Sequence, residues 1–247
     1  MERRALIIYC NNTASGRLNG PIADNKNIID HLTSYLGGEW YDDEILSLQN
    51  PSSQKVSIAV KNFLNGADYT FTIFSGHGFI NTDDNKTQYC EVANGDISIM
   101  RLVSNAPRQT ILIDACRGFH SPSQQALVKG MSGVYEYFTG DPMSTRRIFD
   151  NAVLAAEKGI TVLYAAYEDE SAADSDRGGA YTYSFLKVCK NWEKSDREYN
   201  ILTVKQAHNA GIMYMNKNFI TKQQPTMNQE KRLRYFPIAV KFTPLYG

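Results

Sequence analysis

The amino-acid sequence predicts an α/β fold in which a central, mainly parallel sheet of about six strands carries helices on both faces. Short apolar runs, typical of strands that are buried on both faces, alternate along the chain with segments of helical spacing. This alternation is typical of parallel sheets, because parallel neighbours are joined by crossover helices. The 247 residues suffice for one sizeable core, so we expect a single domain over residues 1–247.

The first four elements are expected in the order strand, helix, strand, helix. Residues 5–9 form a continuous apolar run and should be a buried strand. Residues 21–36 carry Ile and Leu at helical spacing, and Pro21 suits the first turn of a helix. Residues 44–48 predict a short second strand, and residues 51–64 predict a helix with one apolar face.

The middle of the chain contains two further apolar runs, residues 69–74 and 110–113, which we expect to be strands. Between them lies a polar, hairpin-like insert in which residues 88–92 are a possible strand. Residues 97–103 are a candidate helix. Both apolar runs end in turns that contain glycine, so the backbone can turn sharply there.

The second half of the chain begins with residues 119–145, which lack periodicity and are rich in Ser, Gly, Pro and Gln. A long segment of this kind is usually functional or flexible, and we expect an exposed, flexible loop at about 119–146. The pattern beyond it predicts a helix at 147–158, a strand at 160–166, an acidic loop at 168–179, helices at 180–192 and 203–216, and a last strand at 236–242.

Charge and cysteine content argue against several classes of protein. Lys and Arg together number 26, as do Asp and Glu, so no overall field attracts nucleic acid or an anionic membrane. No apolar run approaches the ~20 residues that span a bilayer. The four cysteines show no CxxC motif or metal-like spacing, and no secretory signal is recognisable. We therefore expect a cytoplasmic protein with reduced thiols, without a nucleic-acid or membrane partner, and leave its oligomeric state open.

Two of the expected strands end in turns with chemically reactive side chains. His77 lies in the Ser-Gly-His-Gly turn at residues 75–78, and Cys116 lies in the Asp-Ala-Cys-Arg-Gly turn at residues 114–118. Ligands of parallel sheets bind at the carboxyl ends of the strands, and successive strands are often neighbours, so we expect the two turns side by side. An imidazole beside a thiol can take up its proton and later protonate a leaving amine.

These two turns resemble the His and Cys motifs of the caspase, metacaspase and paracaspase superfamily of cysteine peptidases. Caspases have Gln where this chain has Asp114, and an Asp there is typical of the metacaspase and bacterial caspase-like branch. Cys116 follows His77 by 39 residues, compared with about 50 in the caspase signature. The resemblance covers nearly the whole chain, is weakest in residues 119–145, and implies a caspase-like three-layer sandwich.

The resemblance also implies roles for the site residues. Cys116 would attack the scissile carbonyl, His77 would act as acid and base, and the backbone amides of Gly78 and Cys116 would form the oxyanion hole. No third catalytic residue is obvious, and the chemistry needs no cofactor. Calcium activation, known in some metacaspases, would involve residues 83–84 or 42–44. Neither acidic stretch resembles a calcium loop, so a solvated surface is the favoured interpretation and no metal site is expected.

The resemblance further implies a substrate preference. In metacaspases an Asp two residues before the Cys, a Ser two residues before the His and an acidic residue entering the first helix form a pocket for Arg or Lys. The corresponding residues here are Asp114, Ser75 and Asp24, and Asp174 is a looser candidate for the rim. Paired carboxylates in a half-buried pocket repel one another unless a cation joins them. We therefore hypothesise cleavage after Arg or Lys, and not after Asp, in a protein or peptide substrate.

The long loop is also a candidate processing site, because the corresponding segment of the family is often cut during maturation. With a preference for basic residues, self-cleavage would follow Lys129, Arg146 or Arg147.

Three other functions stay open on the sequence alone. The chain could be a caspase-like binding module without activity, a different thiol hydrolase such as a thioesterase, or a caspase-like protease with another side-chain preference. The intact His77 and Cys116 count against the first, and an acidic pocket favours a cationic peptide over a thioester. The other cysteines and histidines are expected to be inert, structural or bystanders: Cys10, Cys90, Cys189, His31, His120 and His208.

Overall fold

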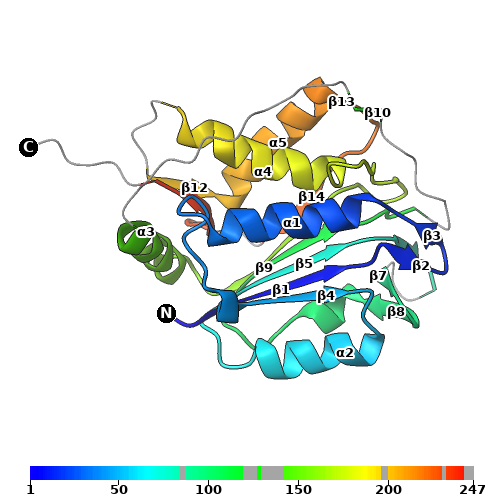
Figure 1. Ribbon diagram of the computed structural model, residues 1–247, viewed down its shortest axis with the longest axis horizontal. Coiled ribbons are helices and arrows are strands. Elements are labelled where there is room, and N and C mark those ends of the chain that lie inside the picture. Colours follow the sequence, from blue (N-terminus) through cyan, green and yellow to red (C-terminus); the bar gives the residue numbers. More distant parts are fainter. Residues whose placement is uncertain (84–86, 119–126, 129–141, 196–199, 230–231, 242–247) are drawn as a thin grey trace, which may run out of the picture.

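The computed structural model describes residues 1–83, 87–118, 127–128, 142–195, 200–229 and 232–241. Six strands form its central sheet: β1 (Arg3–Tyr9), β4 (Ile45–Gln49), β5 (Tyr69–Ser75), β9 (Arg108–Asp114), β11 (Gly159–Tyr164) and β14 (Thr226–Gln229). Their spatial order is β14-β11-β9-β5-β1-β4 (Figure 1). Five strands are parallel, and β14 runs antiparallel to β11 at one edge.

Helices cover both faces of this sheet and complete the three-layer α/β sandwich expected from the sequence. They are α1 (Gly20–Thr33), α2 (Ser53–Ile58), α3 (Pro142–Ala155), α4 (Ala180–Glu193) and α5 (Val204–Asn218), and one π-helical stretch, η2 (Ala59–Phe63), continues α2. In Figure 1, α1, α4 and α5 lie above the sheet and α2 lies below it. Different helices therefore cover the two faces of the central sheet.

Each face of the sheet has its own apolar core. On the α1 side, Leu32 packs in a cluster that includes Ile73 of β5. On the α2 side, Val56 packs in a second cluster that includes Phe74 of the same strand. Consecutive strand residues point to opposite faces, so the two neighbours in β5 enter different cores. This explains why the strand is buried along its whole length.

Four smaller sheets complete the described part of the chain. The one nearest to β5 in sequence is the antiparallel sheet of β6 (Gly78–Asn81), β7 (Thr87–Val92) and β8 (Gly95–Ser98). The others are pairs of short strands: β2 (Asn12–Thr13) with β3 (Gly16–Arg17), β10 (Leu127–Val128) with β13 (Phe219–Ile220), and β12 (Ile201–Thr203) with β15 (Pro237–Val240).

The candidate helix at residues 97–103 is a wrong prediction. β8 ends at Ser98 and only a short 3-10 helix, η3 (Ile99–Leu102), follows. Ala93 and Asn94 join β7 to β8, and Gly95, the first residue of β8, has φ +126°. An Asn-Gly pair is a strong hairpin signal, and here it returns the chain as a second strand.

The start of α3 and the pairing of the last strand also differ from the sequence prediction. α3 begins at Pro142, so the aperiodic segment ends earlier than residue 146. The predicted last strand exists as β15, but it pairs with β12 outside the central sheet. The sixth strand of the central sheet is β14, whose Thr-Met-Asn-Gln sequence has no apolar run. As an edge strand, β14 pairs on one side only, which relaxes the need for apolar residues.

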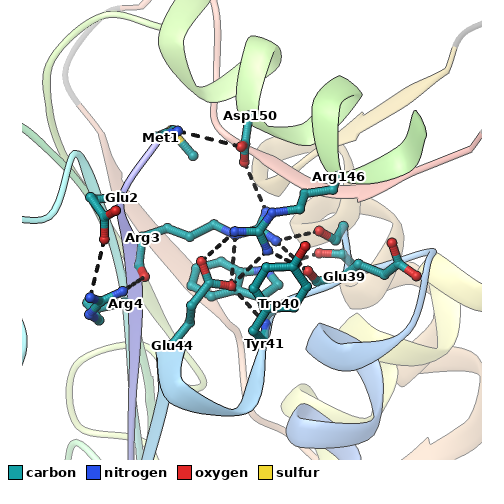
Figure 2. Close-up of polar contacts among 12 residues, drawn as sticks. Met1, Glu2, Arg3, Arg4, Glu39, Trp40, Tyr41, Glu44, Arg146 and Asp150 are labelled. Atoms are coloured by element: carbon teal, nitrogen blue, oxygen red, sulfur yellow. Dashed lines mark hydrogen bonds and ion pairs between the residues drawn. The ribbon is translucent and has the colours of Figure 1, made fainter. Parts of the chain in front are cut away.

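Arg3 at the start of β1 is fully buried and joins three segments of the chain (Figure 2). Its guanidinium donates to the carbonyls of Gly38 and Glu39 over 2.6 and 2.7 Å. It also pairs with Glu44 at 3.4 Å and with Asp150 of α3 at 3.1 Å. Burial lowers the pKa of Arg3, and the two carboxylates oppose that shift. This cluster attaches α3 to the first strand.

Candidate active site

The carboxyl ends of β5 and β9 place the expected site residues side by side. Ser75 and Asp114 are the last residues of these adjacent parallel strands, and they pair in the sheet register. The amide of Gly76 donates to the Asp114 carbonyl over 3.1 Å, which ties the turn after β5 to β9. His77 and Cys116 each follow this pair by two residues, so both emerge at the same edge of the sheet.

A pocket that is open to solvent lies at this edge, and its space, counted together with the open solvent at its mouth, is about 290 Å³. Five of the residues expected from the sequence line it: Ser75, His77, Asp114, Cys116 and Asp174. The start of α1 and the segment after β11 supply most of the remaining lining: Leu18, Pro21, Gly76, Ala172, Ala173 and Gly179. None of these lining residues is Lys or Arg, so the carboxyl groups at the pocket face no fixed cation from its wall.

The Cys116 side chain is held against the segment after β11. The residue is 5% exposed, and the amide of Ala172 donates to its Sγ over 3.3 Å. Burial raises the pKa of Cys116, and the hydrogen bond from Ala172 opposes this shift only in part. A raised pKa favours the thiol over the thiolate, so nucleophilic attack by Cys116 requires a base that takes its proton.

His77 brings an imidazole to the same pocket. The residue is 9% exposed, and its Nε2 has no hydrogen-bond partner among the described residues. Its carbonyl accepts a hydrogen bond of 3.0 Å from the amide of Glu91 in β7, which fixes the turn. A buried imidazole nitrogen without a fixed partner is available for proton exchange with a neighbouring group or a bound substrate.

Asp24 lies one layer behind the pocket wall and is 1% exposed. Its carboxyl group accepts a hydrogen bond of 2.6 Å from Ser75 Oγ. The amide of Gly179 donates to both of its oxygens at 3.1 Å. The structure therefore brings Asp24 to the expected place, but it contacts the pocket through Ser75 and Gly179.

Asp114 and Asp174 line the pocket itself. Asp114 accepts a hydrogen bond of 3.0 Å from the amide of Thr182 in the first turn of α4. Asp174 accepts hydrogen bonds of 3.2 Å from the amides of Asn19 and Gly20 at the start of α1. Each carboxyl group thus meets the amino end of a helix, where free amides and the helix dipole favour negative charge.

Three neighbouring carboxyl groups, of which Asp24 and Asp114 are buried and Asp174 is half-buried, nevertheless disfavour full ionisation. Burial raises the pKa of Asp24, Asp114 and Asp174. The charge of Asp114 raises the pKa of Asp24 further, and the charge of Asp174 acts in the same direction on Asp114. A cation placed among the three groups would relieve both the burial and the repulsion.

Gly78, the first residue of β6, lies directly against the turn that contains Cys116. A Cβ atom at residue 78 would lie 2.9 Å from Ala115 Cβ and 3.2 Å from the Cys116 carbonyl oxygen. No side chain fits between these two backbone segments, so only glycine permits this approach. The amides of Gly78 and Cys116, the two expected oxyanion donors, therefore belong to segments in direct contact.

Comparison with known proteins decides the family. The family model described as a caspase domain matches residues 2–237, which is most of the chain. The chain belongs to the caspase domain family. Its fold is similar to the crystal structure of caspase-1 from Spodoptera frugiperda, with a TM-score of 0.59 and 10% sequence identity. That similarity covers 92% of this chain and 86% of the insect caspase. A sequence comparison with curated proteins found no match.

Three glycines of this caspase domain lie against the three carboxyl groups, and the sequence alone did not reveal them. A Cβ at Gly20 would lie 1.6 Å from Asp174 Oδ1. At Gly178, which has φ +115°, it would lie 2.2 Å from Asp24 Oδ1, and at Gly179 it would lie 2.3 Å from Asp114 Oδ2. The carboxyl groups are therefore positioned against bare backbone. The Gly-Gly pair was a visible signal, but nothing local shows which carboxyl groups it faces.

Replacing Gly179 with alanine is expected to lower kcat/KM for Arg-ending peptides by about tenfold. The new Cβ must displace the Asp114 carboxyl group or the loop that carries Gly179. Displacement of a carboxyl group from its position weakens its interaction with the substrate. Steady-state kinetics measures the effect. The matched control is Gly211→Ala in α5, because the atoms nearest to its added Cβ, such as Phe185 Cα at 3.3 Å, belong to the backbone of α4 and not to a carboxyl group. Unchanged kinetics in Gly179→Ala, with Gly211→Ala equally active, would contradict the expectation.

The remaining candidates of the caspase domain lie elsewhere or have structural contacts. His31 Nε2 lies 2.9 Å from the Ile238 carbonyl oxygen, and His208 Nδ1 lies 2.6 Å from the Tyr181 hydroxyl oxygen. His120 and Lys129 lie outside the described residues. Cys10, Cys90 and Cys189 are buried free thiols, and burial raises the pKa of each.

As far as the structure describes them, the acidic stretches considered for calcium do not gather into a site. Residues 42–44 form the 3-10 helix η1 (Asp42–Glu44), and Glu44 is bound to Arg3 and Arg146. Asp84 lies outside the described residues. Within the residues that the structure describes, no three His, Cys, Asp or Glu side chains are arranged to hold a metal ion. In the same part of the chain, no helix is both long and apolar enough to cross a membrane.

Proposed function

We propose that this caspase domain is a cysteine endopeptidase that cleaves peptide bonds after Arg or Lys. The observation that carries the proposal is the gathering of three carboxyl groups at the pocket that Cys116 and His77 line. Membership of a peptidase family supports hydrolysis of peptides. The side-chain preference rests on the charge of the pocket wall alone.

In the proposed reaction, His77 takes the proton of Cys116 as the sulfur attacks the scissile carbonyl carbon. The amides of Gly78 and Cys116 stabilise the oxyanion that forms on the carbonyl oxygen. The imidazolium of His77 then protonates the leaving amine, and a thioester remains on Cys116. Attack by water, deprotonated by His77, releases the acid and restores the thiol. This order agrees with the raised pKa of Cys116, because the proton leaves the sulfur during attack.

The preference for a basic side chain follows from the unfavourable free energy of placing the carboxylates of Asp24, Asp114 and Asp174 close together. Arg binds a carboxylate through two parallel hydrogen bonds, and Asp114 and Asp174 line the open pocket that a guanidinium would enter. Lys offers a point charge with fewer oriented donors, so we expect Arg to be preferred over Lys. An Asp side chain would add a fourth carboxyl group to the cluster and should be excluded.

Four fluorogenic peptides that differ only in the residue before the scissile bond test the proposal. We expect kcat/KM to fall in the order Arg, Lys, Ala, Asp, with Arg above Asp by at least 100-fold. A fast Asp-ending substrate would contradict the preference for basic residues. Hydrolysis of none of the peptides, with binding of an Arg-ending peptide intact, would favour a binding module. Preferential hydrolysis of a neutral acyl thioester would favour a thioesterase.

Self-cleavage in the long loop is expected after Lys129 and not after Arg146 or Arg147. Arg146 and Arg147 lie in α3, and a protease binds its substrate as an extended chain. Arg146 also has fixed partners: its guanidinium lies 2.6 Å from Glu44 Oε1 and 3.9 Å from the Tyr41 ring centroid (Figure 2). Cleavage at either arginine would therefore require unfolding of the helix start and loss of this ion pair.

Mass spectrometry of the purified protein identifies the cut. We expect a fragment ending at Lys129 that disappears in Lys129→Ala and persists in Arg147→Ala. A fragment that begins at Arg147 or Ile148 would show that α3 unfolds before processing and would contradict this prediction.

A further inference from the structure

We infer that Gln88 is a positioning residue that holds the two halves of the oxyanion hole together; this inference rests on the proposed function. Gln88 lies in β7 and is 2% exposed. Its Nε2 donates to the Cys116 carbonyl over 3.1 Å. Its Oε1 accepts a hydrogen bond of 2.6 Å from Arg117 Nε. One buried amide therefore bridges the backbone of the nucleophile and the side chain of the next residue.

Chemistry fixes the orientation of this bridge. A guanidinium can only donate and a peptide carbonyl can only accept. The side-chain oxygen of Gln88 must therefore face Arg117, and its nitrogen must face the Cys116 carbonyl. A carboxylate of the same shape keeps the contact with Arg117 but cannot donate to Cys116. An apolar chain of the same length loses both contacts and leaves two buried polar groups without partners.

The strand that carries Gln88 also carries the partner of Gly78. In the antiparallel ladder of β6 and β7, Gly78 pairs with Cys90, two residues beyond Gln88. A Cβ at Gly78 would lie 2.8 Å from the Tyr89 carbonyl oxygen, so β6, β7 and the nucleophile turn meet at one point. One proposed oxyanion donor, Gly78, begins β6, and the other, Cys116, lies in the turn after β9. β7 is the element that binds both, Gly78 through the ladder and Cys116 through Gln88.

The far side of the nucleophile turn is fixed independently. The amide of Arg117 donates to the Glu170 carbonyl over 2.8 Å, and the amide of Asp169 donates to the Arg117 carbonyl over 3.1 Å. The Arg117 guanidinium carbon lies 4.2 Å from the Tyr164 ring centroid. These contacts position the turn relative to β11 and the segment after it. They do not involve Gly78, whereas Gln88 joins the strand that pairs with Gly78 to the Cys116 carbonyl.

Gln88→Glu and Gln88→Met test the inference in the full-length protein. We expect kcat for Arg-ending peptides to fall about 10- to 100-fold in both variants, while KM changes less than threefold. Displacement of one oxyanion donor weakens stabilisation of the transition state and leaves side-chain binding in the acidic pocket intact. Inhibition by an Arg-ending peptide aldehyde should weaken by the same factor as kcat, because its hemithioacetal oxygen occupies the oxyanion hole.

Alkylation of Cys116 by iodoacetamide separates positioning from a general loss of structure. This reaction forms a sulfur–carbon bond and releases iodide without creating an oxyanion, so we expect its rate to stay within twofold of the unchanged protein. Gln109→Met is the matched control. Gln109 is 4% exposed, hydrogen bonds to the backbone of Ser104 and Ala106, and lies at the opposite end of β9. It should lower Tm comparably and leave both kcat and alkylation unchanged.

The outcomes are distinguishable. If kcat and the alkylation rate fall together in the Gln88 variants, the residue acts on the thiol or on folding, and the inference is overturned. Folded variants with unchanged kcat overturn it as well. If the unchanged protein hydrolyses no peptide at all, the proposed function fails and takes the inference with it.

Discussion

Replacing Cys116 with alanine is expected to abolish hydrolysis of Arg-ending peptides, with kcat reduced at least ~10⁴-fold. Removal of the nucleophile from a nucleophile–base pair costs this much or more, because the remaining oxyanion donors and binding contacts supply only a small residual rate. The structure gives a specific reason to expect a full loss. The Cys116 side chain is the sulfur that lines the pocket with His77, and the other described cysteines do not line it.

Steady-state kinetics with the Arg-ending fluorogenic peptide measures this loss, and fluorescence anisotropy with a labelled peptide measures binding. Binding should persist within about threefold, because the acidic groups of the pocket are untouched. Cys189→Ala is the matched control: it removes a buried thiol of α4 whose Sγ donates to the Phe185 carbonyl over 3.3 Å. It should lower stability and leave kcat unchanged. More than about 1% residual activity in Cys116→Ala would contradict the assigned nucleophile.

Replacing Asp114 with asparagine is expected to lower kcat/KM for Arg-ending peptides by roughly 100-fold. The amide keeps an oxygen for the hydrogen bond from Thr182, but it removes a buried negative charge from the wall that would bind the guanidinium. Loss of one partner of a buried charge pair is costly in this way. The effect should be selective, so the ratio of Arg to Ala cleavage should fall by a similar factor.

The same substitution is expected to stabilise the free protein at neutral pH. The pKa of Asp114 is raised in the folded state, so its contribution to stability is greatest below the ordinary aspartate pKa of about 4. That contribution is lost as pH rises through the raised pKa of the folded state. At neutral pH the buried charge of Asp114 therefore lowers the free energy of unfolding. Asp114→Asn removes this dependence. Its Tm should exceed that of the unchanged protein near pH 7.5, and the difference should shrink or reverse near pH 4.5.

Thermal unfolding at the two pH values and kinetics with Arg- and Ala-ending peptides test both parts of this prediction. A change of 1 kcal/mol corresponds to roughly 2–4 °C in a chain of this size, which calorimetry resolves. Asp176→Asn is the matched control, since Asp176 lies in the same loop as Asp174 but is exposed. It should alter neither selectivity nor the pH dependence of Tm. A lower Tm for Asp114→Asn at pH 7.5 would argue against repulsion within the cluster.

The sequence was most informative where local chemistry follows an apolar strand. The turns of His77 and Cys116 can be recognised in the sequence, because reactive residues and glycines directly follow the apolar runs at residues 69–74 and 110–113. The parallel sheet then places both in one pocket. Asp24 and Asp174 were harder to place, since each comes from a segment far away in the chain. Only the fold shows that Asp24 stands behind Ser75 while Asp174 lines the pocket.

Other parts of the site left little local signal. Gly178 and Gly179 look like an ordinary loop end, and their role depends on carboxyl groups from α1 and β9. Gln88 is one polar residue in a possible strand, and only the folded structure shows that it contacts Cys116. The edge strand β14 was missed because its four residues carry no apolar run. In each case the deciding contact is long-range, and periodicity reports only on neighbours along the chain.

The path of the chain through the central sheet has a consequence for a molecule that has been nicked after Lys129. One half would keep β1, β4, β5 and β9, and the other would keep β11 and β14. The halves remain joined along six paired residues of β9 and β11 and through the ion pairs of Arg3 and Arg146. Such a molecule would behave as a heterodimer of its own halves that dilution does not separate. Because His77 and Cys116 come from one half and Asp174 and Gly179 from the other, neither half alone carries the complete lining of the proposed active site.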